Sequence, residues 1–263
     1  MKRVARLVAV YMQYIRISFS SSVAYRLDFI FTQIIMLISS LFIPLLTVLI
    51  YSNGGELPGW SFHEALLIQS VFMLCTGFCA PFFNNMVWIT MDHVREGTYD
   101  MLMLKPGSTI FINIASSFGF EQIGAFAGGA GMFIYSLSNL PPVSVLGAAQ
   151  FGLLFIMGVC MNLGCILLLS AVSFKWVGNS RLFQIYDAMT MFGRYPGGIF
   201  SNVVQIVTAW VIPVAMLGFF PAAAILGRAT AQMFLAAIPC AAFLALGWLV
   251  FRRMLYLYQS AGG

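Results

Sequence analysis

The sequence has few charged residues. Of its 263 residues, 8% are charged and 61% are hydrophobic. Soluble globular domains carry roughly 25% charged residues, so a water-facing surface cannot be built from this chain. The composition therefore predicts an all-α integral membrane protein, with residues 1–263 forming a single transmembrane domain.

Residues that carry chemistry are also scarce. The five cysteines have no CxxC spacing and lie in apolar stretches, which is typical of small buried hydrophobic residues. The two histidines, His63 and His93, fall in segments that the topology below puts on opposite sides of the bilayer. We therefore expect no metal site, no catalytic residues and no Ser-His triad in this chain.

A phosphate-binding P-loop is missing as well. That motif needs Gly-x4-Gly-Lys followed by Ser or Thr. The only lysines, Lys2, Lys105 and Lys175, are followed by Arg, Pro and Trp. Any nucleotide energy must come from another polypeptide, so we expect no cofactor in this chain.

Long uncharged runs predict six membrane-spanning helices, since one span needs about 20 apolar residues. The runs cover residues 29–55, 65–91, 122–174, 195–227 and 229–251. The turn signal Asn139-Leu140-Pro141-Pro142 divides the third run into two helices. With the N-terminus inside, all Lys and Arg residues except Arg228 fall on the inner side, which predicts that both termini are cytoplasmic.

The N-terminal segment 1–28 is expected on the cytoplasmic side or in the interface. Apolar residues recur at helical spacing over residues 3–17, with basic residues elsewhere, as in an amphipathic helix that lies in the inner interface. The alternative is a basic leader that only orients the first span.

The run 195–227 is too long for one span, and helix breakers mark its outer end. Pro213, Gly218, Pro221 and Gly227 suggest that the fifth span ends near Gly218 and that residues 219–227 re-enter the outer leaflet. A simple outer loop is the alternative.

Glu121 is the acidic residue nearest to a span interior, so it is a candidate proton or substrate site. The alternative is a boundary position, with an interfacial helix over residues 109–120 and the third span beginning near Ile123. Within that span, Gly124 and Gly128 form a GxxxG pattern that predicts close helix packing.

The densest cluster of charge lies within the loop 89–108. There, charged residues share a short segment with the apolar run Met101 to Leu104, and Pro106 ends any helix. The segment is either a solvated loop or a surface that docks on a partner protein or on the interface.

This loop also carries a resemblance. The stretch from Arg95 to Pro106 resembles the motif R-x-G-(T)-(L)-D-x-L-L-L-(K/R)-P of bacterial type-2 ATP-binding-cassette (ABC) transporter permeases. A second block, with Gly193-Arg194-Tyr195-Pro196, Pro213, Pro221 and Leu226-Gly227-Arg228, and the ending Tyr258 to Gly262 are similar to the same branch. The one visible departure is Gly107, where a small aliphatic residue is common.

The resemblance implies a permease subunit of an exporter in the bacterial inner membrane. Such permeases pair with an identical or homologous permease, bind two copies of a separate ATPase subunit, which holds ATP and Mg²⁺, and pass substrate along the dimer interface. By analogy, the coupling segment runs from Asp92 to Leu104, with Arg95, Glu96 and Asp100 as polar contacts. The expected coupling residues are Asp92, Arg95, Glu96, Gly97, Thr98, Asp100, Leu102, Lys105 and Pro106, and the other motif residues are Arg194, Tyr195, Pro196, Pro213, Pro221 and Arg228.

Two further questions stay open at this point. An ATP-independent secondary transporter or channel is the alternative function, although it would need ionisable residues in several spans. Polar residues among many Phe and Met residues suit an amphipathic or apolar cargo, and nothing indicates binding of nucleic acid.

Overall fold

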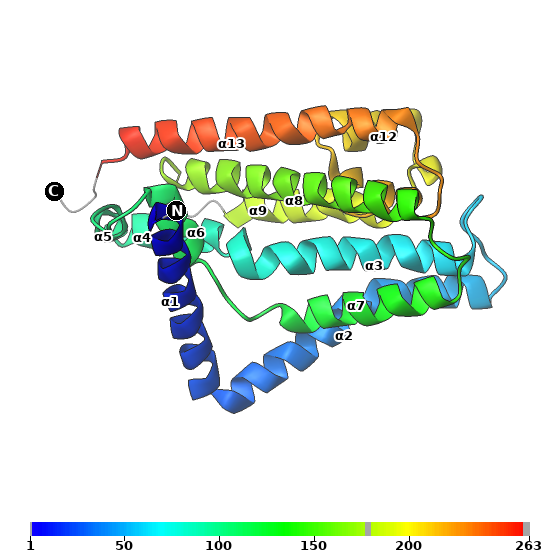
Figure 1. Ribbon diagram of the computed structural model, residues 1–263, viewed down its shortest axis with the longest axis horizontal. Coiled ribbons are helices and arrows are strands. Elements are labelled where there is room, and N and C mark those ends of the chain that lie inside the picture. Colours follow the sequence, from blue (N-terminus) through cyan, green and yellow to red (C-terminus); the bar gives the residue numbers. More distant parts are fainter. Residues whose placement is uncertain (1, 177–179, 260–263) are drawn as a thin grey trace.

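The described part of the chain is helical throughout. The computed structural model describes residues 2–176 and 180–259, which contain no β-strand. Figure 1 shows helices α3 (Phe62–Cys79), α7 (Ile123–Ser138), α8 (Val145–Ser173) and α13 (Ala237–Leu257) side by side along the long axis of the molecule. This arrangement is a bundle, as the all-α prediction requires.

Four segments of the described residues are long and apolar enough to cross a membrane. They are α2 (Arg26–Ser52), Phe62–Arg95, α8, and Ala231–Leu257, which joins α12 (Ala231–Leu235) to α13. Two other apolar helices, at Ile123–Ser138 and Asn202–Val211, are shorter. The helix positions follow the predicted runs, and the predicted turn at residues 139–142 separates α7 from α8.

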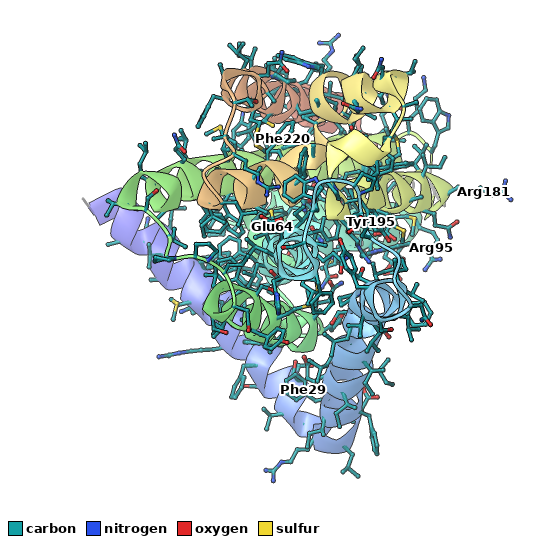
Figure 2. The ribbon with its side chains drawn as sticks, turned by 90° about the vertical axis from the view of Figure 1, so that its right-hand side faces the viewer. Phe29, Glu64, Arg95, Arg181, Tyr195 and Phe220 are labelled. Atoms are coloured by element: carbon teal, nitrogen blue, oxygen red, sulfur yellow. The ribbon has the colours of Figure 1, made fainter. Side chains whose placement is uncertain are left out.

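Helix α3 lies at the centre of the bundle. In Figure 2, which looks toward one end of the helices, its cyan ribbon is surrounded by the others. Of the most apolar stretch of Phe62–Arg95, 72% is buried, whereas the corresponding share of α2 is 11%. Helix α2 therefore presents most of its apolar surface to lipid or to another protein.

Glycines let the helix backbones approach closely. A Cβ on Gly164 of α8 would collide with the backbone of Phe243 and Leu244 in α13, and one on Gly247 would collide with Gly164. Gly124 of α7 lies in the same way against the carbonyl of Gln33 in α2, and Gly128 faces Leu37 and Ser40. The close packing predicted for the GxxxG pattern is confirmed.

Helix α1 (Lys2–Ala24) runs at a steep angle to the bundle and turns at Tyr25 into α2 (Figure 1). It is longer than the predicted 3–17 and includes a run of serines, of which Ser22 Oγ donates to the Ser18 carbonyl at 2.9 Å. The N-terminal helix and the end of α13 both lie beside α5 (Tyr99–Met103) (Figure 1). We call this the α5 end, and the opposite one the Arg228 end.

The segment after α8 is broken into short helices. They are α9 (Ser180–Thr190), η2 (Met191–Arg194), η3 (Gly197–Ile199), α10 (Asn202–Ile206), η4 (Val207–Val211), η5 (Val214–Leu217) and α11 (Phe219–Ile225). The fifth span was predicted as one helix within the run 195–227, ending near Gly218. The structure shows several short helices there instead, because Pro196, two following glycines and Pro213 interrupt the chain. Gly193 contacts Val214 directly, so the chain returns at Val214 to the place that it left after Gly193.

Helix α11 is enclosed by α3 and α8. Ala222, Ala223 and Ala224 are fully buried, and Gly147 at the start of α8 faces the carbonyls of Ala224 and Ile225. Gly227 then turns the chain with a φ of 73°, which favours glycine. The residues that were expected to re-enter the membrane are therefore helical and packed against the bundle.

Candidate functional site

The rod formed by α3, the π-helical turn η1 (Ala80–Asn84) and α4 (Met86–Arg95) spans the bundle and gives a scale of position along it. Glu64 bonds Arg228 at one end, Phe72 contacts Arg194, and Pro81 bonds Gly119. At 1.5 Å per residue, Phe72 lies about 15 Å and Pro81 about 28 Å from the first residue of α3. Arg194 therefore lies inside the bundle, about a third of the way along a rod of about 50 Å.

The segment Asp92 to Leu104, which we call the docking segment, lies at the α5 end. Helix α4 ends at Arg95, and Gly97 turns the chain into α5 with a φ of 68°, a conformation that favours glycine. The His93 ring nitrogen Nδ1 and Thr98 Oγ1 are 2.7 Å apart across this turn. The turn therefore fixes the direction of α5 relative to α4.

One face of α5 is anchored in the bundle. Tyr99 and Leu102 are buried with Val94 and with Ile112 of α6 (Thr109–Ser116). Asn113 Nδ2 donates to the Tyr99 hydroxyl at 3.1 Å and to Thr90 Oγ1 at 2.8 Å. Burial raises the pKa of the Tyr99 hydroxyl well above its usual value, so Tyr99 is neutral at physiological pH.

The opposite face of α5 is apolar and exposed. Met101, Met103 and Leu104 are 66%, 41% and 84% exposed. The charged side chains beside them, Asp92, Arg95 and Glu96, are exposed too, and the Asp92–Arg95 pair at 3.2 Å contributes little to stability at such exposure. A rigid helix with an exposed apolar face and a charged margin is suited to protein docking.

Not all predicted coupling residues face outward. Leu102 is buried and holds α5 in place. Lys105 Nζ donates to the Tyr14 hydroxyl at 3.1 Å, which links the segment to α1. Pro106 is exposed, but α5 has already ended at Met103, so proline is not what terminates this helix. Gly97, Thr98 and Asp100 are half-buried in and just after the turn.

Glu121 lies in the turn before α7 and is exposed. The preceding Gly119 donates its N–H to the Pro81 carbonyl at 3.0 Å, and Gln33 Nε2 donates to the Phe120 carbonyl at 2.9 Å. Helix α7 begins at Ile123, as the boundary alternative expects, while α6 ends at Ser116 rather than at residue 120. Whether Glu121 has a transport role stays a prediction.

The other motif residues lie elsewhere in the bundle. Pro196, Pro213 and Pro221 are buried and Tyr195 is half-buried. Arg228 lies at its own end, where it bonds Glu64 Oε1 at 2.7 Å and the Gly59 carbonyl at 3.1 Å. Of the terminal motif, residues 260–262 are outside the described part of the chain.

The sequence analysis missed a polar cavity around Arg194. Its volume is about 250 Å³, and its wall includes Asn84, Asn162, Tyr186, Asp187 and Arg194. Counting uncharged runs assumed that every charged residue lies outside a span, so Asp187 and Arg194 were assigned to an inner segment. Asparagines within apolar runs were the available signal.

The histidines and cysteines are dispersed in the described part of the chain. Residues 2–176 and 180–259 contain no group of three His, Cys, Asp or Glu side chains that could hold a metal ion. His63 and His93 lie thirty residues apart on the α3–α4 rod, which corresponds to about 45 Å. All five cysteines are free, and four of them are buried.

The fold and composition define a multi-pass membrane protein. Residues 34–262 match the family described as ABC-2 family transporter protein, and the chain belongs to this family. It is thus a membrane component of a transport system and not itself a catalyst. The comparisons with curated proteins and with solved structures gave no match.

Proposed function

We propose that this chain is the permease subunit of an ABC exporter, driven by a separate ATPase. The docking segment carries this proposal. It combines a buried anchor, formed by Tyr99 and Leu102, with an exposed apolar face at Met101, Met103 and Leu104. An ATPase groove that accepts this face would gain apolar burial from the methionines and leucine and orientation from Arg95, Glu96 and Asp100.

The proposed topology has six crossings with both termini in the cytoplasm of a bacterial cell. Helices α2, α3–α4, α8 and α12–α13 are long enough, and α7 and the α9–η4 region complete the set as shorter or broken crossings. The α5 end then faces the cytoplasm, and α1 lies in the inner interface. Residues 219–227 form the re-entrant part on the outer side, since their apolar helix is enclosed by α3 and α8.

A second permease, identical or homologous, would complete the translocation route. Helix α2 supports this, because its exposed surface includes a long series of large apolar side chains that two-helix packing or lipid would cover. They include Ile30, Phe31, Ile34, Ile35, Ile38, Phe42, Leu45 and Leu49. The cargo would be amphipathic or apolar and would leave from the inner leaflet between the two permeases.

In this mechanism the permease makes and breaks no covalent bond. ATP would bring two ATPase subunits together, and each docking segment would follow its subunit. Because Tyr99 and Leu102 tie the segment to α6, α8 and α13, its displacement would reach the bundle. ATP then drives the change in access through its different affinity for the two conformations.

Co-purification with the ATPase tests the proposal. The chain is tagged, expressed together with its neighbouring genes and purified in mild detergent, and the bound subunits are quantified by mass spectrometry. Wild type should retain a stoichiometric ATPase, and Met101→Glu/Leu104→Glu should lose most of it. Glu96→Ala/Asp100→Ala should weaken retention by a smaller factor, because rim charges contribute less than a buried apolar centre.

The matched control is Val145→Glu/Leu146→Glu. These residues are 89% and 68% exposed at the Arg228 end, so the same chemical change is made away from the docking segment. Retention of the ATPase by this control, with its loss from the docking variant, supports the proposal. Absence of an ATPase from the wild-type preparation contradicts it.

A further inference from the structure

Arg194 lies inside the bundle and forms no salt bridge within the part of the chain that the structure describes. Its guanidinium is 4.6 Å from the centre of the Phe72 ring, and Phe72 is ten residues from the start of α3. Within the described residues, the salt bridges are Asp92–Arg95 and Glu64–Arg228, and neither involves Arg194. A charge at this depth is costly unless it is paired or faces a polar cavity, and such residues commonly bind ligands or ions.

The Nε atom of Arg194 is buried and has no hydrogen-bond partner. The ring of Phe72 attracts the cation but accepts no conventional hydrogen bond. An arginine presents its donors as a planar fork that matches the oxygens of a carboxylate or phosphate. Arg194 is therefore a donor group held in place without an acceptor.

Other unpartnered polar atoms line the same cavity. Asn84 Oδ1, Asn162 Oδ1 and the Tyr186 hydroxyl are buried without hydrogen-bond partners, and all three residues belong to the wall of the Arg194 cavity. Asn162 is 2% exposed. Buried polar groups are normally satisfied, so several orphaned atoms around one cavity of about 250 Å³ point to a missing polar ligand.

We propose that the Arg194 cavity binds the acidic head group of an amphipathic molecule. The carboxylate or phosphate would accept from Arg194, and hydroxyl or amide groups next to it would bond Asn84, Asn162 and Tyr186. The apolar tail would leave along Phe72 and Met73 of α3, which line the same cavity. That this molecule is the cargo rests on the proposed function, whereas the binding site itself does not.

Asp187 provides a second, independent test of the proposal. This exposed residue of α9 also contributes to the cavity wall, yet it forms no ion pair with Arg194. Its carboxylate repels an incoming anion and competes with the anionic head group for the positive charge of Arg194. Removing the charge of Asp187 should strengthen anion binding, and removing the charge of Arg194 should weaken it.

The test measures binding of labelled dodecyl phosphate to the full chain in nanodiscs of phosphatidylcholine. Dodecanoate should compete, and dodecanol, with the same chain length and no charge, should not. Arg194→Gln should weaken binding at least about tenfold, Arg194→Lys by less, and Asp187→Asn should strengthen it about threefold. The control Arg181→Gln, whose side chain projects from the edge of the bundle on the same helix as Asp187 (Figure 2), should bind as wild type does.

Equal competition by dodecanol, or unchanged binding in Arg194→Gln, overturns the proposal. If Arg194→Gln does not fold, the comparison of anionic and neutral ligands on wild type and the gain in Asp187→Asn decide the matter. ATP hydrolysis by the complete complex then separates the sources. Stimulation by dodecyl phosphate indicates a transported anion, and phosphatidylglycerol that co-purifies with wild type but not with Arg194→Gln indicates a resident lipid.

The two proposals fail separately, because the binding assay needs no ATPase. A chain that binds dodecyl phosphate through Arg194 without retaining an ATPase has the anion site but not the exporter role. A complex that retains its ATPase but binds charged and neutral amphiphiles equally well supports the exporter role and contradicts the anion site.

Discussion

Charged and polar groups at the ends of the bundle differ from those in its interior in how many partners they have within the protein. At the Arg228 end, Arg228 bonds Glu64 and the Gly59 carbonyl and stacks 4.6 Å from the centre of the Trp60 ring. In the interior, Arg194 lies over the Phe72 ring and has an unpartnered Nε. The first arginine closes a contact between distant parts of the chain, and the second has hydrogen-bonding capacity to spare.

The α5 end resembles the Arg228 end in this respect. Tyr99 accepts a hydrogen bond from Asn113, and Lys105 donates to Tyr14. Interactions of this kind hold segments together and are satisfied within the protein. Arg194 has no such hydrogen-bond partner among the described residues, and this contrast is the basis of the binding site proposed above.

The largest effect should follow from disturbing the close backbone contact at Gly193, the neighbour of Arg194 in sequence. Gly193→Ala would force a Cβ against the Val214 carbonyl and the Phe72 ring, and should lower stability by about 1–3 kcal/mol. Gly198→Ala, five residues away with open space around it, should change stability little. Thermal unfolding in detergent, followed by size-exclusion chromatography, compares the two, and equal melting temperatures would contradict the close contact.

Substitution of the two arginines should affect the stability of the protein differently. Arg228→Gln loses the bond to Glu64 and should cost about 1 kcal/mol, since the pair is partly exposed. Arg194→Gln removes an unpaired charge from the interior and should raise the melting temperature or leave it unchanged. The same thermal assay without added amphiphile checks this prediction. A larger decrease in melting temperature for Arg194→Gln than for Arg228→Gln would contradict it.

A smaller effect is expected at the α5 end. Tyr99→Phe keeps the buried ring and removes one of the two acceptors of Asn113 Nδ2, which should cost about 0.5 kcal/mol because the bond to Thr90 Oγ1 remains. Limited proteolysis of the loop 89–108 should then speed up. Tyr25→Phe, which removes a hydroxyl from a 74% exposed residue, is the control and should leave the rate of cleavage unaltered.

The pH dependence of this end should be the smallest effect, because it vanishes at neutral pH. Burial raises the pKa of Tyr99 in the folded protein, while in the unfolded chain the hydroxyl ionises near pH 10. Stability is therefore fully present below pH 10 and falls above it, as the unfolded state loses protons first. Between pH 9 and pH 11, the melting temperature should decrease less steeply with pH for Tyr99→Phe than for wild type. The same slope in both proteins would show that burial does not raise the pKa of Tyr99.

Helix positions were largely predictable from the sequence, because an uncharged run of sufficient length has few alternatives. The turn at residues 139–142 and the start of α7 at Ile123 were predicted in this way. The broken segment between Arg194 and Pro213 was not, because proline and glycine show where a helix is interrupted but not where the chain goes next.

The candidate site was predictable only in part. The mixture of charge and apolar residues marked the docking segment, but which side of α5 faces outward depends on the contacts of Tyr99 and Leu102 with residues far along the chain. The depth of Arg194 was not accessible, since the rule that charges lie outside spans holds on average and fails at polar cavities.

The π-helical turn η1 interrupts the rod between α3 and α4, and it contains both Pro81 and Asn84. A turn with π geometry and a proline is the least regular part of a helix and the place where it bends most easily. The docking segment lies on one side of this joint, and Asn84 of the joint itself borders the Arg194 cavity. A sideways force on α4 would therefore bend the rod at η1. Because Asn84 of η1 is part of the cavity wall, this bending would change the shape of the cavity.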